Sequence, residues 1–280
     1  MKNYLILTKS FYLESIRSKT ALVWNLAFPV LFVIGFSLIF ANGDPNGVSF
    51  VLPGVLSINI ITASFFGLSM SMVTMRENGI FRRFRVTPLK EISLIAAFST
   101  NAFINMMISI GLQLLVAISI FKMPLKNHLL DFCIVSIISL FAFIPLGLFV
   151  GSTARDSKTA PAITNLLFFP LMFLSGSALP LFLLPGWTHE IAKLLPSSYV
   201  MELYRGVLTS GLRLTDLFTP MIILFLTGII GFVFNRLLFR WESSQNISLI
   251  KISIALVFLF TVYVLAFFLV PQLSTAVRPA

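Results

Sequence analysis

The sequence has little charge: only 11% of its 280 residues are Asp, Glu, Lys or Arg, whereas 58% are hydrophobic. A soluble domain carries about 25% charged residues, because its surface must face water. A single core of this size cannot bury the excess of apolar side chains, so that excess must face lipid. The scarcity of charge therefore predicts an integral membrane protein.

Several motifs of catalysis and cofactor binding are also missing. The chain has one cysteine, Cys133, which excludes a disulfide framework and a cysteine cluster for a metal. It contains no G-x-x-x-x-G-K-[ST], HExxH, C-x-x-C or G-x-S-x-G, and its two histidines, His128 and His189, stand apart. We expect no catalytic residues, no metal site and no ATP bound by this chain itself. The net charge is +10, but no polar stretch is long enough for a nucleic-acid-binding module, so we expect no nucleic acid partner.

Charged residues are absent from seven long hydrophobic runs. A helix needs about 20 residues to cross a hydrocarbon core of about 30 Å, and these runs do not alternate as barrel strands would. We expect spans at approximately 21–40, 51–75, 92–121, 132–150, 161–184, 217–235 and 252–270. A transporter driven by protons or sodium usually has an ionisable group at membrane depth, so the runs argue against that mechanism. Sodium sites built from backbone carbonyls stay open.

The basic residues predict the orientation. If the amino terminus is cytoplasmic and every run crosses, 14 Lys and Arg side chains fall inside and six outside, while the acidic residues divide evenly. The positive-inside rule therefore favours a cytoplasmic amino terminus. We expect a multi-pass protein of the plasma membrane.

Three parts of the chain are expected. Residues 1–20 mix apolar and basic side chains, which suits an amphipathic helix at the membrane interface, although a frayed basic leader is the alternative. Residues 21–240 hold six spans. Residues 247–271 contain a seventh run, for which a span is favoured over a segment lying flat.

The most informative stretch is the loop 76–91, which is inside in this topology. Read as a short helix, it places Glu77, Ile80, Phe81 and Phe84 on one side and leaves the arginines on the flanks. Such an element could dock into a groove on a soluble subunit. Alternatively, its arginines only fix topology and touch anionic lipid. The residues alone leave both interpretations open.

Two motifs resemble the permeases of type 2 ATP-binding-cassette (ABC) transporters. In that family, this loop carries Glu-x-Gly, a bulky residue, Arg and Thr-Pro. The second match lies between runs five and six, in Leu174-Ser175-Gly176, Leu184-Pro185-Gly186-Trp187, Leu195-Pro196-Ser197-Ser198-Tyr199 and Glu202-x-x-Arg205-Gly206. The resemblance implies a six-helix all-α permease core, to which the seventh run is an addition, and an extracellular helical hairpin at 182–214.

The resemblance also implies functional residues. The coupling loop would dock on a separate ABC ATPase subunit, which binds ATP and Mg, through Glu77, Gly79, Phe81, Arg82, Arg83, Phe84, Arg85, Thr87 and Pro88. A second permease copy would complete a substrate path lined by Asn59, Ser64, Phe65, Phe66, Asn165, Phe168, Phe169 and Met172. An extracellular gate or dimer contact would include Pro196, Tyr199, Glu202 and Arg205. For the path residues, ordinary helix packing is the competing interpretation.

The expected function is therefore that of the membrane subunit of an exporter. It would move an amphipathic or lipophilic substrate, such as a drug, lipid or peptide, or a lipid-linked glycan, with membrane lipid around it. The alternative is an ATP-independent secondary transporter or a membrane scaffold whose basic loop only sets topology.

Overall fold

The computed structural model of the chain describes residues 2–87, 89–125, 129–242 and 249–269, and every regular element in these ranges is a helix. In chain order they are α1 (Lys2–Arg17), α2 (Lys19–Leu22), η1 (Val23–Ala27), α3 (Phe28–Ala41), α4 (Pro45–Thr62), η2 (Ala63–Leu68), α5 (Ser69–Glu77), α6 (Ile80–Arg85), α7 (Glu91–Ser119), α8 (Leu129–Thr153), α9 (Ala160–Phe173), η3 (Leu181–Leu183), α10 (Gly186–Ala192), α11 (Pro196–Arg205), η4 (Gly206–Ser210), α12 (Phe218–Leu238) and α13 (Leu249–Leu269). Of the η elements, η3 is a 3₁₀ turn and the others are π-helical.

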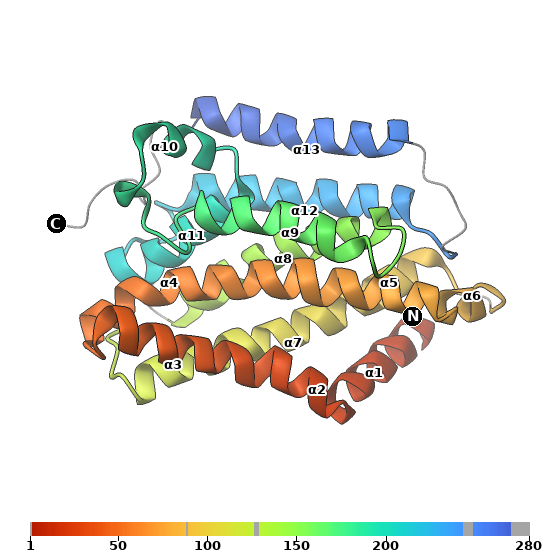
Figure 1. Cartoon of the computed structure of the whole chain (residues 1–280), viewed down its shortest axis with the longest axis horizontal. Helices are drawn as coiled ribbons and strands as arrows, with labels where there is room; N and C mark the ends of the chain where they lie inside the picture. Colours follow the sequence, from red (N-terminus) through yellow and green to blue (C-terminus); the bar gives the residue numbers. More distant parts are fainter. Residues whose placement is uncertain (1, 88, 126–128, 243–248, 270–280) are drawn as a thin grey trace.

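Long helices run along one common direction and give the molecule the form of a bundle (Figure 1). Among the described residues, six stretches are long and apolar enough to cross a bilayer: Lys19–Ala41, Pro45–Glu77, Glu91–Ser119, Leu129–Thr153, Phe218–Leu238 and Ile250–Phe268. Helices α6 and α10 lie at opposite ends of the bundle, on the right and left of Figure 1. We call these ends the α6 end and the α10 end. The predicted all-α, multi-pass membrane fold is confirmed.

The fifth predicted span differs from the structure. We expected a helix over 161–184, but α9 ends at Phe173 after 14 residues, which is about 21 Å of helix and too short for a hydrocarbon core of about 30 Å. Gly176 has φ +86°, which a side chain would disfavour, and the Ala178 N–H donates to the Met172 carbonyl (3.2 Å) to close the turn. The chain therefore turns back within the bundle.

Helix α8 packs against α5, η2, α7 and α12, with a close backbone approach at Gly147. A Cβ atom on Gly147 would lie 2.2 Å from the Ser64 carbonyl oxygen of η2. In a bilayer the hydrophobic effect does not drive helices together. Close packing holds them instead, and small residues at such contacts make it possible.

The π-helical turn η2 joins the second span to α9. A π-helical turn disturbs the regular i→i−4 pattern and leaves carbonyls available to other donors. The Phe65 carbonyl accepts from the Thr164 hydroxyl of α9 (3.1 Å) and from the Ser69 hydroxyl of its own span. The π-helical turn thus holds α9 through a buried hydrogen bond.

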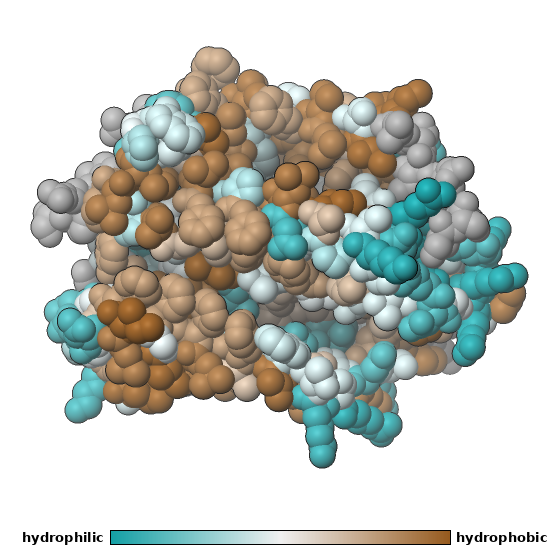
Figure 2. All heavy atoms as spheres, in the orientation of Figure 1, coloured by the Kyte–Doolittle hydropathy of each residue, from teal (hydrophilic) through white to brown (hydrophobic). Residues whose placement is uncertain are grey.

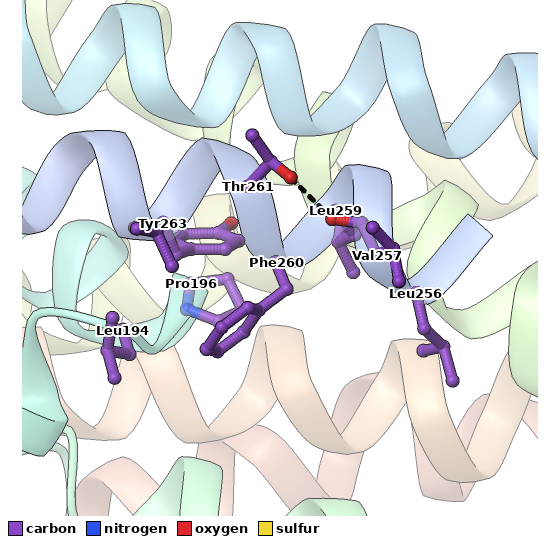
Figure 3. Close-up of a pocket in the computed structure, with 9 residues that line it drawn as sticks. Leu194, Pro196, Leu256, Val257, Leu259, Phe260, Thr261 and Tyr263 are labelled. Carbon is purple, nitrogen blue, oxygen red and sulfur yellow. Dashed lines mark hydrogen bonds between the residues drawn. The ribbon is translucent and has the colours of Figure 1, made fainter. Parts of the chain in front are cut away.

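The first and last helices flank the bundle. Helix α1 packs on α7 through the Phe11 and Phe98 rings (5.6 Å) and a hydrogen bond between the Tyr4 and Thr100 hydroxyls (2.8 Å). Helix α13 runs beside α12, where the hydroxyls of Tyr263 and Thr227 are 2.6 Å apart. An apolar cavity of about 500 Å³ lies between α13 and the start of α11, with Phe260 next to Pro196 (Figure 3).

Candidate functional site

The strongest sequence prediction falls on residues 76–87, which we call the basic element. Helix α5 ends at Glu77, and Gly79 follows in the left-handed conformation (φ +70°). Glycine adopts this conformation at little cost, so the chain bends there and begins α6 directly. The α6 end is hydrophilic over much of the visible face (Figure 2), and the exposed arginines of the basic element, Arg82, Arg83 and Arg85, contribute to this surface.

The segment after α12 holds α6 in place. Phe81 is buried, and its ring centroid lies 5.6 Å from that of Phe239. Glu242 Oε1 is 3.1 Å from Arg85 Nη1 and 4.0 Å from Arg82 Nε. Both arginines are well exposed, so each pair contributes about 0 to 1 kcal/mol. The buried aromatic contact is therefore the main anchor of α6.

Two buried arginines bind the carboxyl end of α8. Arg76 donates to the carbonyls of Gly151 (3.0 Å) and Ala154. Arg240 donates to the carbonyls of Ser152 (Nη2 at 2.7 Å) and Ala154 (2.7 Å). The last carbonyls of a helix have no intrahelical partner and carry a partial negative charge, so two guanidinium groups satisfy and neutralise them.

We call Arg76 and Arg240 the arginine clamp. Burial, and then the nearby charge of Arg155, lower the pKa of Arg240. The guanidinium nevertheless keeps its charge near neutral pH, as arginine does in proteins. The clamp therefore connects three parts of the α6 end: the basic element, α8 and the segment after α12.

The predicted coupling residues divide into an inner and an outer set. Phe81 faces the protein's own interior, and Phe84 is half-buried against the same core. Glu77 accepts a hydrogen bond from the Ser157 N–H (2.9 Å). Arg83 and Thr87 are exposed, and so is Val86, which is 86% exposed and was not among the predicted residues. Pro88 lies outside the described residues.

The predicted substrate-path residues also divide into two sets. Ser64 and Phe65 are buried, and the Phe65 ring packs edge-on against Phe143 of α8 (6.2 Å). Asn59 points to α7, where its amide donates to the Ser109 hydroxyl (3.2 Å). These three residues pack inside the chain.

The other path residues lie together on an exposed face of α9. The Phe66 and Phe168 rings are 5.1 Å apart, and Phe169 stacks on Phe173 at 6.3 Å. Half of the Phe169 side chain is exposed. We call this surface the α9 face; it consists of Phe66, Asn165, Leu166, Phe168, Phe169, Met172 and Phe173, of which all but Phe66, Phe168 and Met172 are exposed. It belongs to the largely hydrophobic middle of the view in Figure 2.

Helix α11 lies inside the bundle, in contact with α4, α8, α9 and α12. Pro196 and Glu202 are half-buried, whereas Tyr199 and Arg205 are buried. The Tyr199 hydroxyl donates to the Lys193 carbonyl (2.6 Å), and the Arg205 guanidinium lies 5.0 Å from the centre of the Phe50 ring. Burial lowers the pKa of Arg205. The four residues predicted for a gate or dimer contact thus share one helix that is packed on most of its sides.

Sequence reasoning did not find the clamp. Arg76 and Arg240 follow the second and sixth runs, where basic residues commonly mark topology. Their common partner, the end of α8, is 75 or more residues away from each of them in the sequence. In the described part of the chain, no group of three His, Cys, Asp or Glu side chains is placed to hold a metal.

Comparison with known proteins bears on this geometry. The family model described as "ABC-2 type transporter" matches residues 2–209, which run from α1 through the basic element and α9 into η4. The chain belongs to the ABC-2 type transporter family. The resemblance predicted from the two motifs is therefore confirmed, and α12 and α13 lie beyond the matched residues.

Individual ABC-2 relatives are distant. The chain is 23% identical to the inner membrane transport permease YhhJ of Escherichia coli over 61% of this chain and 45% of the relative. It is 23% identical to the linearmycin resistance permease protein LnrN of Bacillus subtilis, over 58% of this chain and 42% of the relative. With the putative transport permease ycf38 of Cyanophora paradoxa it shares 24% identity, over 70% of this chain and 71% of the relative. The chain spans less than half the length of YhhJ and LnrN.

Proposed function

We propose that the chain is the membrane-spanning permease subunit of an ATP-driven ABC exporter, with ATP and Mg bound by a separate ATPase subunit. The observation that carries the proposal is the basic element, an exposed helical tip held to the bundle by a buried ring and two buried arginines. Family membership supports the permease assignment, since the relatives YhhJ and LnrN are named permeases.

The ATPase subunit docks on the outer set of the basic element. Arg83, Val86 and Thr87 are exposed there, and together they offer a guanidinium, an apolar contact and a hydroxyl. An apolar contact ringed by charge is typical of a docking surface, in which the centre supplies affinity and the rim supplies specificity. Phe81 acts indirectly in this proposal, by fixing the orientation of α6.

A second permease copy packs on the α9 face. Leu166 is 74% exposed and Phe173 is 42% exposed on a helix too short to span the bilayer alone. Two copies that meet there would enclose a path lined by Phe66, Asn165, Phe168, Phe169 and Met172. Aromatic rings with an occasional amide suit an amphipathic or lipophilic cargo, such as a drug, lipid or peptide, or the lipid of a lipid-linked glycan.

Orientation follows from the basic residues. The α6 end, with the basic element and α1, faces the cytoplasm, and the α10 end faces outward across the plasma membrane. On α1, Leu5 and Ile6 are exposed beside Lys9, as expected of a helix that lies on lipid headgroups. The name of LnrN, a resistance permease, supports outward transport as the direction.

Copurification tests the proposal. The tagged chain, extracted from its native membrane, is expected to bring down a subunit that hydrolyses ATP. Arg83→Glu should lower the recovery of that subunit about tenfold, which corresponds to about 1.4 kcal/mol lost at a charged rim. The matched control, Arg213→Glu in the exposed loop before α12, should leave it unchanged. If the purified chain transports in vesicles without any ATPase, the ATP-independent alternative is correct instead.

A further inference from the structure

Helix α8 is attached at both of its ends to elements with a proposed function. At the α6 end, the arginine clamp binds its last carbonyls. At the α10 end, the Tyr204 hydroxyl of α11 donates to the Ser136 hydroxyl (3.0 Å), and the Tyr204 ring lies 5.8 Å from that of Phe132. With 25 residues, α8 is about 37 Å long, so one helix joins the two ends of the bundle.

The contact at the α10 end is fully enclosed. Tyr204 and Ser136 have no exposed surface. The Ser136 hydroxyl donates to the Phe132 carbonyl (2.8 Å), which leaves its oxygen free to accept from Tyr204. Inside a membrane no water can replace a broken hydrogen bond, so separating Tyr204 from α8 would cost more than it would at a surface.

The body of α8 is suited to moving as one piece. Its buried side makes a backbone contact with η2 at Gly147, where no side chain can yield. Close-packed interiors respond to a displacement by shifting as units, because they have little free volume to absorb it. Pro145 inside α8 removes one backbone hydrogen bond, but its carbonyl accepts from the Asn235 amide of α12 (2.7 Å), so α12 supports the helix at that point. We therefore expect a movement of α8 at one end to appear at the other.

We propose that α8 transmits the transport cycle from the basic element to α11. Arg76 and Arg240 are positioning residues that make α8 follow the basic element, and Tyr204 passes the movement to the helix that carries Tyr199, Glu202 and Arg205. This inference rests on the proposed function, because the ATPase subunit supplies the movement. Contacts that only stabilise the fold would not couple the two ends, and this difference can be measured.

Cys133 provides a reporter for the experiment. It is the only cysteine of the chain, it is a half-buried free thiol, and it lies one turn before Ser136 on α8. The complex of the chain with its copurified ATPase is treated with N-ethylmaleimide, with and without ATP and Mg, and modified Cys133 is quantified by mass spectrometry of its peptide. We expect nucleotide to change the labelling rate about fivefold, at the lower end of coupling between linked sites.

Substitutions separate transmission from folding. Arg76→Gln and Arg240→Gln are each expected to abolish the nucleotide effect on Cys133 while ATPase association persists, because α8 then no longer follows the basic element. Tyr204→Phe should keep the effect on Cys133, which lies on α8 before the step to α11. It should instead abolish the nucleotide effect on a cysteine placed on α11, Glu202→Cys in a Cys133→Ser background. The double variant Arg76→Gln with Arg240→Gln should lose no more than either single variant, because both interrupt the same step. The controls are Arg236→Gln, an exposed arginine of α12, and Tyr263→Phe, which removes an equally buried hydroxyl between α13 and α12. Both should keep the full effect.

Two results would overturn the inference. If the wild-type complex hydrolyses ATP but Cys133 labelling does not respond, or if Arg76→Gln leaves the response of Cys133 unchanged and Tyr204→Phe leaves the response of Glu202→Cys unchanged, α8 does not transmit and the proposed function still stands. If no ATPase associates with the wild-type chain, the proposed function is wrong and the inference falls with it. Tyr204→Phe retains the ring and its packing, so it tests the path even if Arg76→Gln fails to fold.

Discussion

Gly147 shows how much depends on single small residues in this bundle. A methyl group at this position would lie 2.2 Å from the Ser64 carbonyl oxygen, so Gly147→Ala must push α8 away from η2. Overpacking of this kind costs about 1 to 3 kcal/mol. We expect a lower melting temperature of the purified protein in detergent, measured by the loss of helical circular dichroism.

Gly111 supplies the control for that substitution. It lies in the second half of α7, more than two turns from the end of the helix, and a Cβ atom there meets no other atom within 4 Å. Gly111→Ala should therefore leave the melting temperature unchanged or raise it slightly, because alanine favours the helix. Equal destabilisation by both substitutions would show that the loss of stability does not come from the contact between Gly147 and Ser64.

The inner and outer sets of α6 should separate stability from docking. Phe81→Ala removes a buried ring that packs on Phe239, and such truncations cost about 3 to 5 kcal/mol where the surroundings cannot collapse. The loss should appear as faster proteolysis within the basic element and as weaker ATPase association. Proteolysis and ATPase association are both measured on the same membranes.

Val86→Asp is the matched change on the outer set. Because Val86 is 86% exposed, the substitution should leave proteolysis of the basic element unchanged and weaken only the association. If Val86→Asp binds the ATPase normally while Arg83→Glu does not, docking is electrostatic and the apolar tip is not part of the surface.

The elements differ in how much of them the sequence could predict. Six spans were predicted to within a few residues, except at the start of the second, because long apolar runs and their charged ends follow directly from the thickness of the bilayer. The fifth run was predicted too long, since its apolar residues continue past Gly176 into a turn that is buried in protein. A hydropathy pattern cannot distinguish lipid from a protein interior as the surroundings of a residue.

The site was predictable to a similar degree. The sequence predicted a short helix with basic flanks in the loop 76–91, where α6 lies, but it included Glu77, which belongs to α5. It could not show that Phe81 turns inward, because the partner ring, Phe239, is more than 150 residues away. The arginine clamp could not be predicted for the same reason: the residues at the ends of α5 and α12 reach the end of α8 only after the bundle has formed.

For the whole molecule, the two ends have different chemistry. The α6 end carries exposed arginines and a buried clamp, whereas the α10 end carries the turn after α9 and the packed helix α11. Helix α13 is added beside α12, where Tyr263 and Thr227 share a hydrogen bond, and runs from the α6 end to the α10 end (Figure 1). Helix α13 is therefore an additional helix that returns the chain to the α10 end.

This arrangement predicts where three positions lie in the cell. In a Cys133→Ser background, single cysteines replace Arg83, Arg213 or Ser274, and intact cells are treated with a membrane-impermeant maleimide. Arg213→Cys should label at once, because the loop before α12 lies at the α10 end. Ser274→Cys follows α13 in the chain and should also label at once if α13 crosses the bilayer. Arg83→Cys should label only after permeabilisation. Labelling of Ser274→Cys that also needs permeabilisation would mean that α13 does not cross. Labelling of Arg83→Cys in intact cells would place the basic element outside, where no ATPase driven by cellular ATP could bind it.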